Sequence, residues 1–316
     1  GFPASTVYGG RMAVLVAGGP TAALFRANVA RPRLASDYTE SLVSASSLHR
    51  GELFVVGGRL VFVHGDASHD LHYVAATVAE PTGPADWRSH VIVNLVSPGV
   101  ERAFGVVGDR FMVAYMNAAG ALRLTRATTA TPSSPGDWET HTVTMTSGAY
   151  SLGVQVVDEG GRPVIVFATD DGLSFARATT PTPAASSDWA IHVVDAGNYG
   201  RALAMRLTTG WGLFTSGDPA EYRTSTAAIP AATSDWSAPE PVTYAPVVVE
   251  GGIEHMGRPW VAWYEGPDAE SGTFVARPPD APLPDPRGLY WAREALQSDV
   301  VLSRGSYFGG RAPYLL

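Results

Sequence analysis

The sequence predicts an all-β fold, a β-propeller of six four-stranded blades, and two observations lead to this prediction. An Asp-Trp pair recurs at intervals of about 50 residues, the length of one propeller blade. The 34 glycines and 24 prolines supply the many tight turns that short strands need. The clear pairs are Asp86-Trp87, Asp137-Trp138, Asp188-Trp189 and Asp235-Trp236, with weaker versions at Asp37-Tyr38 and Tyr290-Trp291.

Each repeat contains four segments with the alternation and composition of β-strands. The first is moderately apolar, and a tight turn such as Gly160-Gly161-Arg162 separates it from the second. The second is the most apolar, as in Leu60 to Val63 and Val164 to Phe167. A strand that is apolar on both faces suits a sheet covered on both sides by neighbouring blades. The third alternates, and a Thr- and Pro-rich loop leads through Asp-Trp to the fourth.

We expect one propeller domain over residues 1–316. The approximate blades are 1–47, 48–97, 98–147, 148–196, 197–245 and 246–298, with residues 299–316 as closure strands. Residues 5–17 and 300–316 both look like a first-and-second-strand pair. We therefore expect the C-terminal segment to complete or cover the blade begun at the N-terminus. A seventh, partial blade is the alternative.

Composition narrows the classes of function. No cysteine is present and all 22 basic residues are arginine, which excludes disulfides, thiol nucleophiles and lysine Schiff bases. A net charge of −8 argues against nucleic-acid or anionic-membrane partners. No apolar run approaches the roughly 20 residues of a membrane helix. The chain starts at Gly1 without methionine, which is consistent with removal of an export signal. We expect an extracellular, periplasmic or cell-surface location.

The segment from Gly161 to Val193 resembles the repeat of bacterial exported propeller proteins, many of undefined function. Its Gly-Arg-Pro turn, apolar strand, Leu-x-Phe-Ala-Arg-Ala strand and Trp-x-x-x-Val strand carry the resemblance, which spans nearly the whole chain and implies the architecture. The chain is more distantly similar to sialidase-like propellers and propeller lectins. Ser187-Asp188-Trp189 lacks the glycine and spacing of a full sialidase Asp-box, and Gly1-Phe-Pro-Ala does not match the sialidase Arg-Ile-Pro segment.

Groups that recur in every blade are predicted to be structural, because a catalytic group is needed only once. The aspartates are expected to bond their own turns and the tryptophans to pack between blades. Three histidines share one place in the fourth strand and are predicted to be paired structural groups: His90, His141 and His192. Arginines on the third strand either line sugar sites between blades or bond a neighbouring loop: Arg26, Arg126, Arg177 and Arg277.

Residues that break the repeat supply the predicted ligand site. The starts of the first strands and the loops between second and third strands share one face of a propeller, around the central channel. Charges there, including Glu52, are predicted to gather at the channel mouth, and three arginines could clamp the carboxylate of an acidic sugar, with a glutamate as acid/base. The alternative is a ring of mutually neutralised ion pairs. The predicted ligand-binding residues are Glu101, Arg102, Arg201, Glu250, His255 and Arg304.

A second non-repeated group lies in the loop from His64 to His72. Its imidazoles and carboxylates could hold a divalent metal or supply a general base, although the spacing matches no standard zinc motif. An ordinary polar hairpin is the alternative. The predicted metal ligands are His64, Asp66, His69 and His72, and no other cofactor is predicted.

Taken together, these features predict an exported or cell-surface binding module. A carbohydrate is the expected ligand, bound on the face just described. One alternative is a glycoside hydrolase or polysaccharide lyase that acts on an acidic glycan at the channel mouth. The other alternative is a protein-docking scaffold. Whether the chain is an enzyme stays open at this point.

Overall fold

The structure is a computed structural model. It describes residues 2–17, 22–30, 32, 34–44, 51–66, 68, 70–94, 102–146, 153–169, 171–197, 201–216, 219–243, 247–255, 258–265, 273–277 and 292–295. Between residues 243 and 295 only the backbone is described, apart from the buried Pro259 and Val261.

The described strands form six antiparallel sheets of four strands, each in chain order, and we call these sheets blades 1 to 6. Blade 1 comprises β1 (Phe2–Tyr8), β2 (Arg11–Ala17), β3 (Ala22–Ala27) and β4 (Tyr38–Ser44). Blade 2 comprises β5 (Gly51–Val56), β6 (Arg59–Gly65), β7 (Asp70–Ala76) and β8 (Trp87–Asn94). Blade 3 comprises β9 (Arg102–Val107), β10 (Arg110–Met116), β11 (Ala121–Ala127) and β12 (Trp138–Met145).

Blade 4 comprises β13 (Gly153–Glu159), β14 (Arg162–Thr169), β15 (Gly172–Ala178) and β16 (Trp189–Asp195). Blade 5 comprises β17 (Ala202–Leu207), β18 (Gly210–Thr215), β19 (Ala220–Ser225) and β20 (Glu240–Thr243). Blade 6 comprises β21 (Val247–His255), β22 (Arg258–Glu265), β23 (Thr273–Arg277) and β24 (Ala292–Ala295). Short 3-10 turns precede the fourth strands of blades 1 to 5.

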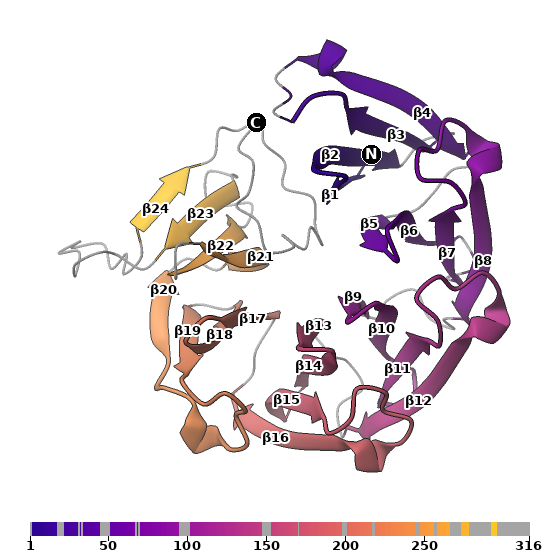
Figure 1. The fold of residues 1–316 in the computed structure, drawn as a ribbon. Helices are drawn as coiled ribbons and strands as arrows, with labels where there is room; N and C mark the ends of the chain where they lie inside the picture. Colours follow the sequence, from indigo (N-terminus) through magenta and orange to yellow (C-terminus); the bar gives the residue numbers. More distant parts are fainter. Residues whose placement is uncertain are drawn as a thin grey trace.

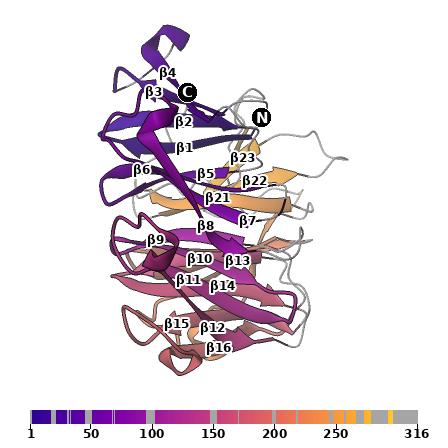
Figure 2. The same cartoon turned by 90° about the vertical axis from the view of Figure 1, so that its right-hand side faces the viewer.

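The blades surround a central axis, with the first strand of each blade innermost and the fourth outermost (Figure 1). Seen from the side, the strands of neighbouring blades stack in layers (Figure 2). The predicted all-β fold and four-strand repeat are confirmed for these sheets. The described residues contain no helix that is long and apolar enough to cross a membrane.

Blade 1 contains both ends of its own sheet, β1 and β4, within one repeat. Blade 1 takes all four of its strands from residues 2–44, so it needs no strand from the C-terminus to be complete. These strands pair in chain order, β1 with β2, β2 with β3 and β3 with β4, and closure of the ring by the C-terminal segment stays a prediction. Residues 299–316, predicted to be closure strands, lie outside the described residues.

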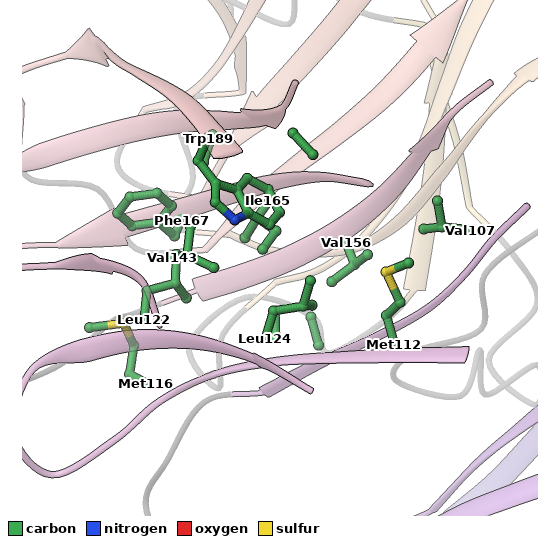
Figure 3. Packing of buried hydrophobic residues seen from close by; sticks show 14 residues of the cluster. Val107, Met112, Met116, Leu122, Leu124, Val143, Val156, Ile165, Phe167 and Trp189 are labelled. Carbon is green, nitrogen blue, oxygen red and sulfur yellow. The ribbon is translucent and has the colours of Figure 1, made fainter. Parts of the chain in front are cut away.

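The hydrophobic core is divided among the interfaces between blades. In β6, Leu60 and Phe62 join a cluster with blade 1, while Val61 and Val63 join one with blade 3. Figure 3 shows the equivalent interface between blades 3 and 4, where Leu124 and Met112 face Val156 and Ile165. The second strands of blades 2 to 5 are thus buried on both faces, as their composition predicts, whereas in β2 only the face of Ala13 and Leu15 is buried.

Close approach of the inner strands requires glycine at particular places. A Cβ on Gly105 of β9 would lie 2.9 Å from a methyl group of Val156 on β13, and a Cβ on Gly153 would lie 2.9 Å from the Cα of Arg201. Real Cβ atoms do not come this close to a neighbour. These two glycines therefore let adjacent blades converge at the axis.

Three of the four repeated tryptophans each donate a hydrogen bond across a blade interface. The Nε1 atoms of Trp138, Trp189 and Trp236 bond the Nε2 atoms of His90, His141 and His192 in the preceding blade, at 2.9, 3.2 and 3.2 Å. Burial lowers the pKa of all three histidines, which keeps Nε2 unprotonated and able to accept. The predicted structural role of these histidines is confirmed.

Blade 1 lacks this hydrogen bond. Trp87 packs against blade 1, where Ser41 takes the place that histidine holds in the later blades. The Nε1 of Trp87 is buried and has no hydrogen-bond partner in the described part of the chain. The interface between blades 1 and 2 therefore depends on apolar packing without this bond.

The repeated aspartates hold the turns that present the tryptophans. In each of blades 2 to 5, one carboxylate oxygen accepts two backbone N–H groups of its own turn, from residues three and four positions earlier. These hydrogen bonds lower the pKa of Asp86, Asp137, Asp188 and Asp235. The Asp-Trp pair is thus one device, in which Asp sets the turn and Trp joins two blades.

Replacing His141 by alanine should destabilise the fold. The change leaves Trp189 Nε1 without its acceptor and opens a gap between two blades. We expect the free energy of unfolding to fall by about 2 kcal/mol in chemical denaturation. Ser41→Ala is the matched control, because Ser41 occupies the same place in blade 1 and bonds no tryptophan. Equal losses from both variants would show that the Trp–His bond contributes nothing.

Candidate functional site

A pocket of about 410 Å³ lies between blades 2 and 3. Blade 2 supplies the end of β5, the start of β6, and β7 and β8, whereas blade 3 supplies the loop after β11. Its volume falls within the range of small-molecule sites in proteins. The lining residues are Val56, Arg59, Val61, Tyr73, Ala75, Ala76, Thr77, Arg88, His90, Thr131, Pro132 and Ser133.

The pocket exists because one repeated side chain is small in blade 2. One position near the end of the third strand is equivalent in the first four blades, because the residue after it pairs with the Tyr or Trp that begins the fourth strand. This position is arginine in β3, β11 and β15. In β7 it is Ala75. Blade 3 fills the place with Arg126, whose Nη2 bonds Glu139 Oε2 at 2.7 Å. Blade 2 instead pairs Ala75 with Arg88. The missing arginine leaves room for a ligand.

Polar groups in the pocket are available for hydrogen bonding. Tyr73 is almost fully buried, and its hydroxyl has no hydrogen-bond partner among the described residues. Burial raises the pKa of Tyr73, so the phenol stays a neutral donor and acceptor. Arg59 and Arg88 are exposed and form no ion pair with any part of the chain that the structure describes. Val61, Ala75 and Pro132 add apolar surface.

The pocket opens on the face that carries the turns between first and second strands and the loops between third and fourth strands. The sequence analysis predicts a ligand site on the opposite face, which carries the starts of the first strands and the loops between second and third strands. Arg59, Tyr73 and Arg88 were not predicted as site residues. The absence of arginine at position 75, in a series that includes Arg26, Arg126 and Arg177, was the signal that could have found them.

Three of the four arginines in the predicted series lie beside glutamates: Arg26, Arg126 and Arg177. Arg26 lies 3.9 Å from Glu80 in the next blade's loop, which matches the predicted loop contact, and Arg177 bonds Glu159 of its own blade. Arg126 bonds Glu139. The side chain of Arg277 lies outside the described residues. Filled grooves with neutralised charges therefore flank the open one.

On the opposite face, the structure brings part of the predicted channel-mouth group together. The guanidinium of Arg102 packs on Gly65, where a Cβ would lie 3.3 Å from Nη2. Arg201 lies against Gly153. Both arginines act electrostatically on Glu52, whose Oε2 atom is buried without a hydrogen-bond partner in the described residues. Burial raises the pKa of Glu52 to about 8, and the positive charges of Arg102 and Arg201 oppose this rise.

The remaining members of that predicted site are not located. Glu101 and Arg304 lie outside the described residues. Glu250 and His255 lie on β21, whose side chains are not described. The six-residue ligand site at the channel mouth stays a prediction, with Arg102 and Arg201 placed near one carboxyl group.

The predicted metal loop forms a stacked and hydrogen-bonded hairpin. The rings of His64 and His72 stack at 5.0 Å with an interplanar angle of 6°, and Phe62 extends the stack. Asp66 Oδ2 bonds His72 Nε2 at 2.9 Å, while Asp66 Oδ1 accepts the backbone N–H groups of Ser68 and Asp70. The hydrogen bond with His72 lowers the pKa of Asp66. Asp66 is thus engaged in holding the hairpin.

His64 is buried beside the hairpin backbone, and its Nδ1 lies 3.0 Å from the Gly65 oxygen. Burial lowers its pKa. No three His, Asp or Glu side chains come together as a metal-holding group within the described residues. His69, the fourth predicted ligand, lies outside them. A metal at this loop therefore stays a prediction that the structure leaves open.

Comparisons with known proteins identify the fold. No protein-family model matches the chain, and no curated protein matches it. Solved structures do. A triple arginine-to-alanine mutant of AofleA from Arthrobotrys oligospora has a TM-score of 0.55 at 11% identity, with 93% of this chain and 86% of that chain covered.

Two lectin structures with a bound methyl fucoside are also similar. The SapL1 lectin in complex with alpha methyl fucoside has a TM-score of 0.55 at 10% identity, covering 93% of this chain and 95% of that one. A mutant of the Aleuria aurantia lectin with alpha-methyl-L-fucoside has a TM-score of 0.51 at 9% identity, covering 98% and 96%. At this identity the likeness shows a shared lectin-like β-propeller fold.

Replacing Glu52 by glutamine should change how stability depends on pH. Between pH 4.5 and about 8 the unfolded carboxyl is ionised while the folded one keeps its proton. Unfolding therefore releases a proton, and the native protein loses stability as pH rises through this window. Glu52→Gln cannot ionise, so we expect its stability to fall less steeply, with a relative gain of a few kcal/mol at the upper end.

Denaturant unfolding at pH values across that window measures the difference between the two proteins. Glu40→Gln is the control, because Glu40 is an exposed carboxyl on β4. Parallel pH profiles for the native protein and Glu52→Gln would contradict the assignment of a protonated Glu52.

Proposed function

We propose that this chain is a carbohydrate-binding propeller that holds a sugar in the pocket between blades 2 and 3. The observation that carries the proposal is the pocket itself, an open inter-blade groove with an unpartnered buried phenol, exposed arginines and apolar walls. The lectin-like fold supports it, since similar structures are lectins with a bound fucoside. An exported location, expected from the sequence, is part of the proposal.

The chemistry of the lining suits a sugar ring. A pyranose presents hydroxyl groups around its edge and C–H groups on its faces, so its site needs hydrogen-bonding groups beside apolar surface. Tyr73 and Thr131 offer hydroxyls, and Val61, Ala75 and Pro132 offer apolar contacts. Trp138 packs against the Tyr73 ring at 5.1 Å and fixes its orientation. The Tyr73 side chain therefore loses little conformational entropy when a sugar binds.

Blade 3 shows how the pocket can be closed without disturbing the fold. Arg126 and Glu139 occupy the positions that Ala75 and Arg88 hold in blade 2, and their side chains form an ion pair there. The double variant Ala75→Arg/Arg88→Glu copies this pair into blade 2. The new arginine should occupy the volume that a sugar would fill.

A glycan array should first identify a bound sugar, and calorimetry should then measure its affinity. We expect the double variant to bind at least about tenfold more weakly, because the pocket is filled and one lining arginine is lost. Its free energy of unfolding should stay within about 1 kcal/mol of the native value, since blade 3 tolerates the same pair.

Ala190→Arg is the matched control. Ala190 lies opposite Arg177 in blade 4, at the place of Arg88 in blade 2, so the variant adds an arginine away from the pocket. Its affinity should be unchanged. Absence of any bound glycan, or full affinity in a folded double variant, would reject the proposal.

A further inference from the structure

The pocket between blades 2 and 3 differs from neighbouring grooves in charge as well as in volume. Arg26, Arg126 and Arg177 each face a glutamate. In blade 2 the third strand, β7, has no arginine at this position, and the arginine is Arg88 on the fourth strand, β8. A second arginine, Arg59, begins β6. No carboxylate lines the pocket. This groove therefore contains cations without their usual partners.

Two carboxylates close in sequence to the pocket are already engaged in turns. Asp86 accepts the backbone N–H groups of Thr82 and Gly83, and Asp137 accepts those of Ser133 and Ser134. His90 adds no charge, because burial lowers its pKa and its Nε2 accepts a hydrogen bond from Trp138. The formal charge of the lining is thus that of its arginines.

Exposed guanidinium groups beside a pocket are suited to an oxyanion. Arginine presents its N–H groups as a planar fork that matches both oxygens of a carboxylate. The chain as a whole carries a net charge of −8, which repels anions at long range. A preference for an anionic ligand must therefore arise from contacts inside this pocket.

We propose that the pocket binds a sugar that bears a carboxylate, and that Arg59 and Arg88 pair with that group. This inference rests on the proposed function and adds the class of ligand to it. The hydroxyls of Tyr73 and Thr131 bond the sugar hydroxyls, while the guanidinium groups select the acid.

The test compares uronic acids with their neutral parents as methyl glycosides: glucuronic, galacturonic and mannuronic acids beside glucose, galactose and mannose. Each pair differs only in a carboxylate in place of a hydroxymethyl group. We expect at least one acid to bind about tenfold more tightly than its parent, with an affinity that falls as salt is added. A neutral sugar found to bind on the array serves as the reference ligand.

Variants assign the preference to the pocket. Arg59→Gln and Arg88→Gln should each reduce the acid-to-neutral affinity ratio several-fold, because each removes a guanidinium that pairs with the carboxylate. Arg110→Gln is the control, because Arg110 begins β10 as Arg59 begins β6 but lies outside the pocket. Its ratio should match that of the native protein.

The outcomes separate this inference from the proposed function. Binding of neutral sugars with no acid preferred over its parent would overturn the carboxylate assignment and leave carbohydrate binding standing. Equal binding of a sulfated sugar would also overturn it, because the pocket would then select charge in general. An acid preference that survives both pocket variants would place the anion elsewhere.

Discussion

No blade of this propeller can bury its own apolar residues. A four-stranded sheet has two faces, and here both faces of each second strand are apolar, as Leu60 and Phe62 on one side and Val61 and Val63 on the other show. Only a neighbouring blade can remove such a face from water. This burial of apolar surface is the dominant favourable contribution to folding. The repeated Trp–His and Asp-turn contacts serve the same interfaces. They fix how closely, and at which height, one blade rests on the next.

The fold was predictable because this constraint repeats along the sequence. From blade 2 to blade 5, each blade needs an apolar second strand, an Asp that closes a turn and a Trp that packs on the preceding blade, so these residues recur and reveal the period. Histidines in one register position could be assigned a structural role for the same reason. The chain departs from the pattern only locally, as at Ser41, where Trp87 has no imidazole partner.

The candidate site was harder to predict because it is formed by the lack of a side chain. Sequence reasoning looks for chemically active residues, and it found Arg102 and Arg201, which the structure does place near the buried carboxyl of Glu52. Ala75 carries no chemistry of its own. Its meaning depends on the register that places it opposite Arg88 and on a loop of the next blade that closes the groove. Those relations are three-dimensional, and one sequence without its strand pairing does not contain them.

The pocket between blades 2 and 3 has walls from two units that otherwise meet through side-chain packing and the Trp138–His90 hydrogen bond. A molecule seated there touches both units at once, so its binding free energy is added to the cohesion of that interface. The occupied protein therefore opens less often at this seam, and the neighbouring backbone amides exchange their hydrogens more slowly. Binding at one groove would in this way raise the free energy needed to separate blades 2 and 3.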